Sequence, residues 1–169
     1  NIMESSGSEI PKAEQGAAAE TIAVGAVKYS LLRVGLGKDI IFDFEKSLSL
    51  EGESGPYLQY TYARCRSILH QSSLIKLSYP HRNQVKLSRE EERVLRLLYR
   101  FPEMVENAAQ NFSPNLVASF AFEVAQAYNT FYNTHRVLQA ETKEAKQFRV
   151  ALTAATAQII HNSLTLLGI

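Results

Sequence analysis

This sequence has very few cysteine and methionine residues and no long apolar runs. Its one cysteine, Cys65, has no partner for an internal disulfide and cannot alone build a thiolate metal cluster, which is consistent with a reducing compartment. No apolar run approaches the roughly 20 residues that span a bilayer, and no charged segment precedes a short apolar one as in a signal peptide. We therefore expect a soluble, cytoplasmic protein with no membrane partner.

A charge excess of either sign is also missing. The 169 residues include 18 Lys and Arg against 17 Asp and Glu, a net charge of +1, so nothing global indicates a nucleic acid, DNA included, or a membrane as a partner. Any basic surface must be local. Hydrophobic residues make up 46% of the chain, which is enough to bury the core of one domain.

Catalytic motifs are absent as well. The sequence has no GxSxG nucleophile elbow, no P-loop and no HExxH zinc motif. No two of the four histidines have the spacing of three or four residues that places two metal ligands on one helix face. These histidines are His70, His81, His135 and His161. We expect neither a catalytic centre nor a metal site, which leaves a binding or interaction module as the leading class.

The spacing of apolar residues predicts an all-α protein, an antiparallel bundle of about five or six helices joined by short loops. A short extended segment is expected at 34–44, and a polar loop at 78–86. The expected helices cover 14–33, 45–50, 56–77, a run that begins after Ser88, a further run that begins at Pro102, a run from Pro114, and 142–167.

Helix boundaries are indicated by capping residues. Ser88 followed by Glu91 is a capping box, and Asp43 can cap the short helix that follows it. Gly168 is expected to stop the last helix. Gly25, in the middle of the first helix, costs about 1 kcal/mol against alanine, which indicates close packing against another element.

The stretch GPYLQYTYARCRSIL, residues 55–69, has more polar aromatic residues than a packed helix needs. On a helical wheel, one sector forms the expected core stripe of Leu58, Tyr62, Cys65, Ile68 and Leu69. Tyr57, Tyr60 and Arg64 share the adjacent sector. Two interpretations remain open from the pattern: these are boundary residues with rings packed and hydroxyls in water, or a platform on which unstacked bases lie.

Three longer stretches resemble the arginyl-tRNA synthetase family of class I synthetases. They are VGAVKYSLLR with KDIIFDFEKSLSLEGESGPYLQY, then LSREEERVLRLLYRFPEMVENAAQNFSPNLVASFAFEVAQAYNTFYNTHRVL, then FRVALTAATAQIIHNSLTLLGI. The similarity runs in the family's order from about Ile22 to the end. It implies the all-helical, DALR-type anticodon-binding domain at 51–169, with 1–50 as a linker and the last helical piece leading from a catalytic domain.

The resemblance also implies tRNA anticodon-binding residues. The two tyrosines of GPYLQY and the arginine four residues after the second match Tyr57, Tyr60 and Arg64, and a further family tyrosine matches Tyr132 in NTFYNTHRVL. For Tyr132 the alternative is a hydrophobic residue at the end of a helix that covers the loop. Asn129 and Arg149 line the same pocket in one interpretation and are helix caps or surface ion pairs in another.

The family's catalytic motifs, HIGH-like and KMSKS-like, are absent from these residues. The resemblance therefore implies a piece of a longer protein, which fits the first residue being Asn1. The parent would be an arginine–tRNA ligase that uses ATP, magnesium, arginine and its tRNA. We expect this chain to be a monomer that binds arginine tRNA without an aminoacylation site or cofactor of its own. The competing hypothesis is a helical bundle whose tyrosine face docks a partner helix.

Overall fold

Every regular element in the described part of the chain is a helix. The computed structural model describes residues 12–72 and 86–169. Within these ranges none of the helices is long and apolar enough to cross a membrane. The helices are α2 (Lys12–Leu32), α3 (Phe44–Leu48), α4 (Gly55–Gln71), α5 (Arg89–Gln110), α6 (Pro114–Thr134) and α7 (Lys143–Leu166). The predicted all-α class is confirmed.

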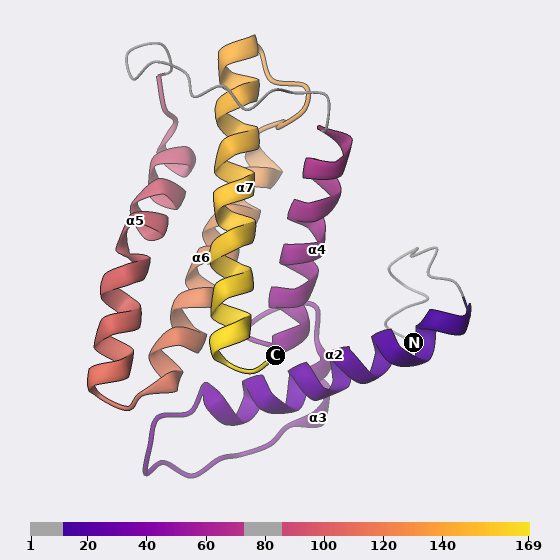
Figure 1. The fold of residues 1–169 in the computed structure, drawn as a ribbon, viewed down its shortest axis with the longest axis vertical. Coiled ribbons are helices and arrows are strands. Elements are labelled where there is room, and N and C mark those ends of the chain that lie inside the picture. The colour runs from indigo at the N-terminus through magenta and orange to yellow at the C-terminus, as the bar shows by residue number, and fades with distance from the viewer. Residues whose placement is uncertain (1–11, 73–85) are drawn as a thin grey trace.

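Four of the helices, α4 to α7, stand side by side, and consecutive ones run in opposite directions (Figure 1). The principal contacts join α5 with α6, α4 with α7, and α6 with α7. Helix α2 crosses the lower end of this bundle and packs against α4 and α6. The predicted antiparallel bundle is therefore observed, with α2 lying across it.

The core lies between these helices and is closed by large side chains. Burial raises the pKa of Cys65 to about 12, so its thiol is not a nucleophile at neutral pH. Tyr29 of α2 donates from its buried hydroxyl to the carbonyl oxygen of Ala118 in α6 at 3.1 Å, which fixes α2 on the bundle. The largest fully buried apolar side chains are Tyr29, Tyr128, Phe131, Leu58, Ile160, Val94, Val124 and Val150.

The predicted capping residues are observed. Ser88 and Glu91 form the reciprocal capping box of α5, and Asp43 accepts from the backbone N–H of Lys46 at 3.0 Å. Gly168 follows α7 with a φ of 70°, a left-handed conformation that favours glycine. Helix α4 ends at Gln71, earlier than predicted. Residues 73–77 of the expected helix, and all of the expected polar loop except Lys86, lie outside the described residues.

Pro102 does not begin a new helix, so that prediction is wrong. It lies inside α5, which is continuous from Arg89 to Gln110. An interior proline removes one backbone hydrogen bond and costs about 3 kcal/mol. The helix continues because one apolar face runs through both of its halves. Val94 and Leu97 are buried before the proline, and Ala108 is buried after it.

The close packing inferred for Gly25 is confirmed at the crossing of α2 and α4. An alanine at Gly55 would place its Cβ 2.5 Å from the carbonyl oxygen of Gly25 and 3.1 Å from the backbone nitrogen of Ala26. Since backbone atoms cannot move aside cheaply, we expect Gly55→Ala to lower the free energy of unfolding by about 1–3 kcal/mol.

Chemical denaturation would measure this effect, and Gly16 in α2 offers a matched control. A Cβ added at Gly16 meets nothing within 4 Å. Gly16→Ala should therefore leave stability unchanged or raise it by up to about 1 kcal/mol through helix propensity. Equal stability of Gly55→Ala and the unmodified chain would contradict the close crossing.

Candidate functional site

Helix α4 carries three of the predicted site residues, and its first turn is firmly fixed. Ser54 precedes the helix and accepts from the backbone N–H of Tyr57 at 3.1 Å, and Pro56 occupies the first turn, where its missing N–H costs nothing. From this start, Tyr57, Tyr60 and Arg64 follow at positions i, i+3 and i+7. They therefore share one side of the helix, as the wheel predicted.

The buried side of α4 differs in part from the prediction. Leu58, Cys65 and Ile68 are buried as expected, but Tyr62 and Leu69 are only partly buried. Thr61 is fully buried instead. Its hydroxyl donates to the Tyr57 carbonyl at 2.9 Å and accepts a second hydrogen bond from a neighbouring helix, so burial leaves no unpaired polar atom in this side chain.

Asn129 of α6 is the side chain that joins the tyrosine side of α4 to the bundle. Its Nδ2 donates to the Tyr57 hydroxyl at 2.9 Å and to the Thr61 hydroxyl at 3.0 Å. Its Oδ1 accepts from Arg64 Nη1 at 2.7 Å. All of its donors and its acceptor are thus used, and three residues of α4 are held in fixed positions. Asn129 is neither a helix cap nor part of an ion pair.

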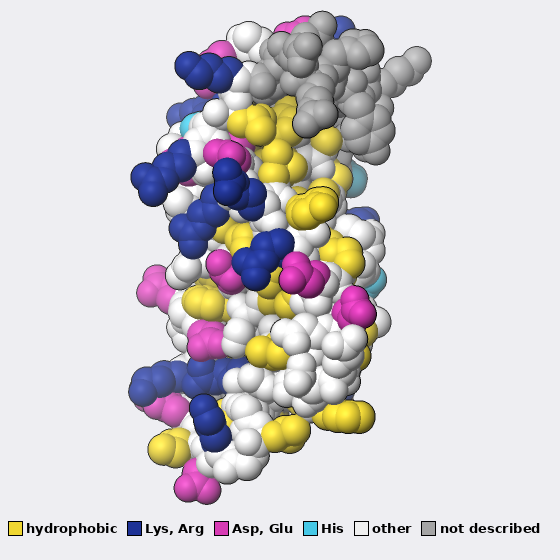
Figure 2. All heavy atoms as spheres, turned by 90° about the vertical axis from the view of Figure 1, so that its left-hand side faces the viewer, with side chains coloured by type: hydrophobic (Ala, Val, Ile, Leu, Met, Phe, Trp, Pro, Cys, Tyr) yellow, Lys and Arg dark blue, Asp and Glu magenta, His cyan; other side chains and the backbone are white. Residues whose placement is uncertain are grey.

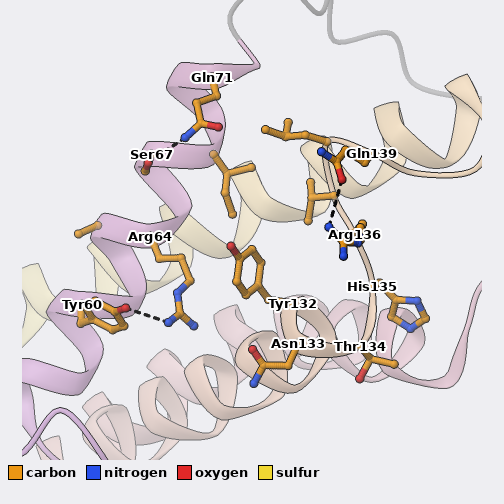
Figure 3. A pocket seen from close by; sticks show the side chains of 14 residues that line it. Tyr60, Arg64, Ser67, Gln71, Tyr132, Asn133, Thr134, His135, Arg136 and Gln139 are labelled. Atoms are coloured by element: carbon orange, nitrogen blue, oxygen red, sulfur yellow. Dashed lines mark hydrogen bonds between the residues drawn. The ribbon is translucent and has the colours of Figure 1, made fainter. Parts of the chain in front are cut away.

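Arg64 lies between two tyrosine rings that come from different helices (Figure 3). Its Cζ is 4.7 Å from the ring centroid of Tyr60 and 5.0 Å from that of Tyr132, distances at which cation–π attraction operates. Its Nη2 also donates to the Tyr60 hydroxyl at 3.0 Å. The guanidinium is therefore held beside aromatic surface, with one edge bound to Asn129.

The three tyrosines differ in how much ring surface they offer. Tyr60 and Tyr132 are 39% and 37% exposed. Tyr132 is backed by the buried ring of Tyr128. The two ring centroids are 6.4 Å apart, and the angle between the ring planes is 22°. Tyr57 is partly buried, with its ring tilted against Phe122 and its hydroxyl bound to Asn129. Tyr60 and Tyr132 are thus the rings that a ligand can reach.

These groups border a groove of about 940 Å³ between the second half of α4 and the end of α6. Residues 135–139, which follow α6, also line the groove, and its polar lining groups include both donors and acceptors. Besides Tyr60, Arg64 and Tyr132, its lining includes Ser67, Gln71, Asn133, Thr134, His135, Arg136 and Gln139.

Arg149 does not join this groove. Its side chain is only 8% exposed, and its Nε donates to Glu91 Oε1 at 2.8 Å, where the Glu91 side chain is 3% exposed. Its Nη1 donates to the backbone carbonyl of Arg136 at 2.9 Å. Arg149 is therefore not a helix cap. It forms a buried ion pair with Glu91 and a second one, at 3.2 Å, with the exposed Glu141, and it also anchors the chain after α6.

Sequence reasoning missed the residues that follow α6. Arg136 lines the groove, donating to Gln139 at 3.1 Å, and His135 lies at its edge. His135 Nε2 is 3.0 Å from Glu90 Oε2, and this hydrogen bond holds the pKa of Glu90 below its usual range. The signal in the sequence was the pair His135 and Arg136 just after the expected helix, since basic residue types at a helix C-terminus complement the helix dipole.

The chain is similar in sequence to a known domain family and to curated proteins. The model of the DALR anticodon binding domain family matches residues 58–169. The arginine–tRNA ligase of Pyrococcus furiosus is 37% identical over 175 aligned positions, which cover 100% of this chain and 28% of that protein. The corresponding protein of Clostridium botulinum is 40% identical over 156 positions, 92% of this chain and 27% of that one.

Solved structures of arginyl-tRNA synthetases have a region with the same fold as this chain. The arginyl-tRNA synthetase of Thermus thermophilus superposes with a TM-score of 0.88 at 30% identity and covers 99% of this chain and 29% of its own. The enzyme of Plasmodium falciparum, at 23% identity, shares the fold with a TM-score of 0.78 over 90% of this chain and 27% of its own. The chain thus spans less than a third of the length of these relatives.

Proposed function

Because the chain belongs to the DALR anticodon binding domain family and its curated relatives are arginine–tRNA ligases, we propose that it binds the anticodon region of an arginine tRNA. In this proposal the parent enzyme uses that contact while it attaches arginine to the tRNA with ATP and magnesium. The observation that carries the proposal is Arg64 held between Tyr60 and Tyr132 at the mouth of a groove.

The aminoacylation step is assigned to the rest of the parent protein. The sequence lacks the class I catalytic motifs, and the described residues bring together no three His, Cys, Asp or Glu side chains that could hold a metal ion. We therefore expect this chain to bind tRNA without charging it, and place the ATP and magnesium sites elsewhere in the parent.

The chemistry of the groove suits an unstacked base. Every arginine codon has G in the middle, so every arginine anticodon has C at its centre. A protein that reads this base must take it out of the loop, cover its faces and bind its Watson–Crick edge. Tyr60 and Tyr132 offer ring faces that contribute about 1–3 kcal/mol per stacked base, and Arg64 offers N–H donors to a base edge or phosphate.

Tyr57 and Asn129 are proposed to position these groups. The hydroxyl of Tyr57 and the guanidinium of Arg64 are both fixed by the Asn129 amide, so the donors are oriented before a base arrives. Pre-ordered side chains lose less conformational entropy on binding.

Base exchange in the tRNA tests this proposal directly. We expect the chain to bind an arginine tRNA about 10- to 100-fold more tightly than the same tRNA with its central anticodon C replaced, since one lost base contact costs about 1–3 kcal/mol. Fluorescence anisotropy at moderate salt would measure both affinities. Equal affinities would contradict specific readout, and no binding of either RNA would favour the partner-helix hypothesis.

A further inference from the structure

Four arginines form a row on the exposed side of α5. They are separate from the groove lined by Tyr60 and Tyr132, which we call the tyrosine groove. We call Arg89, Arg93, Arg96 and Arg100 the arginine ridge. Their spacings of four, three and four residues place them on one helix face over about 16 Å, and all four are exposed. Figure 2, which faces the α5 side of the molecule, shows Lys and Arg side chains gathered toward one edge with acidic side chains among them. A chain of net charge +1 therefore carries a local row of arginines, with acidic side chains beside it.

The ridge borders a second groove, of about 610 Å³, between α5 and α6. Arg96 is paired there with Glu92, at 2.7 Å between Nη2 and Oε1, and Glu90 and Glu123 also line the groove. The side chains of the other three arginines make no hydrogen bond or ion pair with the described residues. Since guanidinium groups favour bidentate contacts with phosphate, three unpaired ones in a row along a groove suit a chain of phosphates.

The two grooves adjoin each other across the end of α6. Ala127 and Thr130 line the second groove, and Tyr132 and Asn133 line the tyrosine groove. The pair Glu90–His135 links them, because Glu90 lines the second groove and His135 the first. A strand that leaves the tyrosine groove can therefore reach the ridge by crossing the last turns of α6.

We propose that the arginine ridge binds the sugar-phosphate backbone of the RNA strand that flanks the bases held in the tyrosine groove. This inference rests on the proposed function. The ridge adds affinity and orientation but no sequence preference, because phosphates are the same at every nucleotide. Glu92 keeps Arg96 occupied, so Arg89, Arg93 and Arg100 are the contacting residues.

The test compares two double variants that each remove two exposed positive charges. Arg93→Gln with Arg100→Gln removes half of the ridge. Lys38→Gln with Arg66→Gln removes equal charge elsewhere, at two exposed positions whose side chains have no bonding partner among the described residues. Affinity for an arginine tRNA and for its central-base variant is measured by anisotropy between about 50 and 200 mM salt. The central-base comparison in the unmodified chain tests the proposed function independently.

The ridge variant should bind both RNAs about tenfold or more weakly, with the slope of log affinity against log salt reduced by roughly 1.4 to 1.8. Its discrimination between the two RNAs should stay unchanged. The control variant should change neither quantity by more than a minor amount. If both double variants lose the same affinity and slope, the ridge proposal fails even where base discrimination persists. If the unmodified chain binds no RNA, both proposals fail.

Discussion

Replacing Arg149 with alanine should lower the free energy of unfolding by about 3–5 kcal/mol, because it leaves the buried carboxylate of Glu91 without its partner. The two side chains are 8% and 3% exposed and meet at 2.8 Å, so both charges lie away from bulk water in the intact protein. The backbone carbonyl of Arg136 loses its donor as well. Urea denaturation followed by circular dichroism would measure the change.

Two further variants show whether the buried charge is the cause. Glu141 also approaches Arg149, at 3.2 Å, but its side chain is 73% exposed, so Glu141→Gln should change stability by less than about 0.5 kcal/mol. The double variant Glu91→Gln with Arg149→Met removes both charges, while the amide oxygen introduced at position 91 can still accept the capping hydrogen bond from the Ser88 N–H. It should be clearly more stable than Arg149→Ala, and equal losses in the two would contradict the explanation.

The ion pair also predicts how stability depends on pH. Burial, the largest influence, raises the pKa of Glu91. The Ser88 backbone N–H and the Arg149 guanidinium outweigh it and hold the pKa below its ordinary value of 4.5. A group whose pKa is lowered on folding stabilises the fold above its unfolded pKa, and this contribution is lost as pH falls through the folded pKa. Stability should therefore decline below about pH 4.5, and less steeply in the double variant.

Arg149 shows where sequence reasoning stops. From the sequence, an arginine near the start of α7 could lie at the surface, cap a helix or line a pocket. The sequence does not decide between these roles, because the partner Glu91 is 58 residues away and no local pattern links the two residues. Pro102 shows the same limit, but here the sequence pattern predicts a helix boundary that the structure does not have. The local rule correctly assigns a cost to an interior proline, but only the packed face of α5 reveals that burial on both sides outweighs it.

The features predicted correctly were those set by neighbours in sequence. The capping box at Ser88 and the shared side of Tyr57, Tyr60 and Arg64 depend on spacings of three to seven residues, which a helix converts directly into geometry. Tyr132 and Asn129 lie on another helix, so periodicity could not bring them to this side. The family resemblance pointed to Tyr132, whereas the sequence left Asn129 open between this pocket, a helix cap and a surface ion pair.

Replacing Arg64 with alanine should weaken binding of an arginine tRNA about 10- to 150-fold, which corresponds to the roughly 1.5–3 kcal/mol of a hydrogen bond to a charged group. The loss has two sources. The RNA loses a cation that lies beside both exposed rings, and Tyr60 and Tyr132 lose the group that lies between them. Stability should fall by only about 1 kcal/mol, since Asn129 keeps its bonds to Tyr57 and Thr61.

Two variants separate the geometry of Arg64 from its charge. Arg64→Lys keeps the charge but has one nitrogen, which cannot serve Asn129 and Tyr60 as two separate guanidinium nitrogens do, so its affinity should be intermediate. Arg66→Ala removes an exposed arginine from the opposite side of α4 and should leave binding nearly unchanged. Full binding by a folded Arg64→Ala variant would show that RNA does not use this groove. If Arg64→Ala and Arg66→Ala lower the affinity for the tRNA equally, the lower affinity would be explained by net charge alone. An intermediate affinity for Arg64→Lys would instead assign part of the recognition to the planar guanidinium that Asn129 and the two rings hold in place.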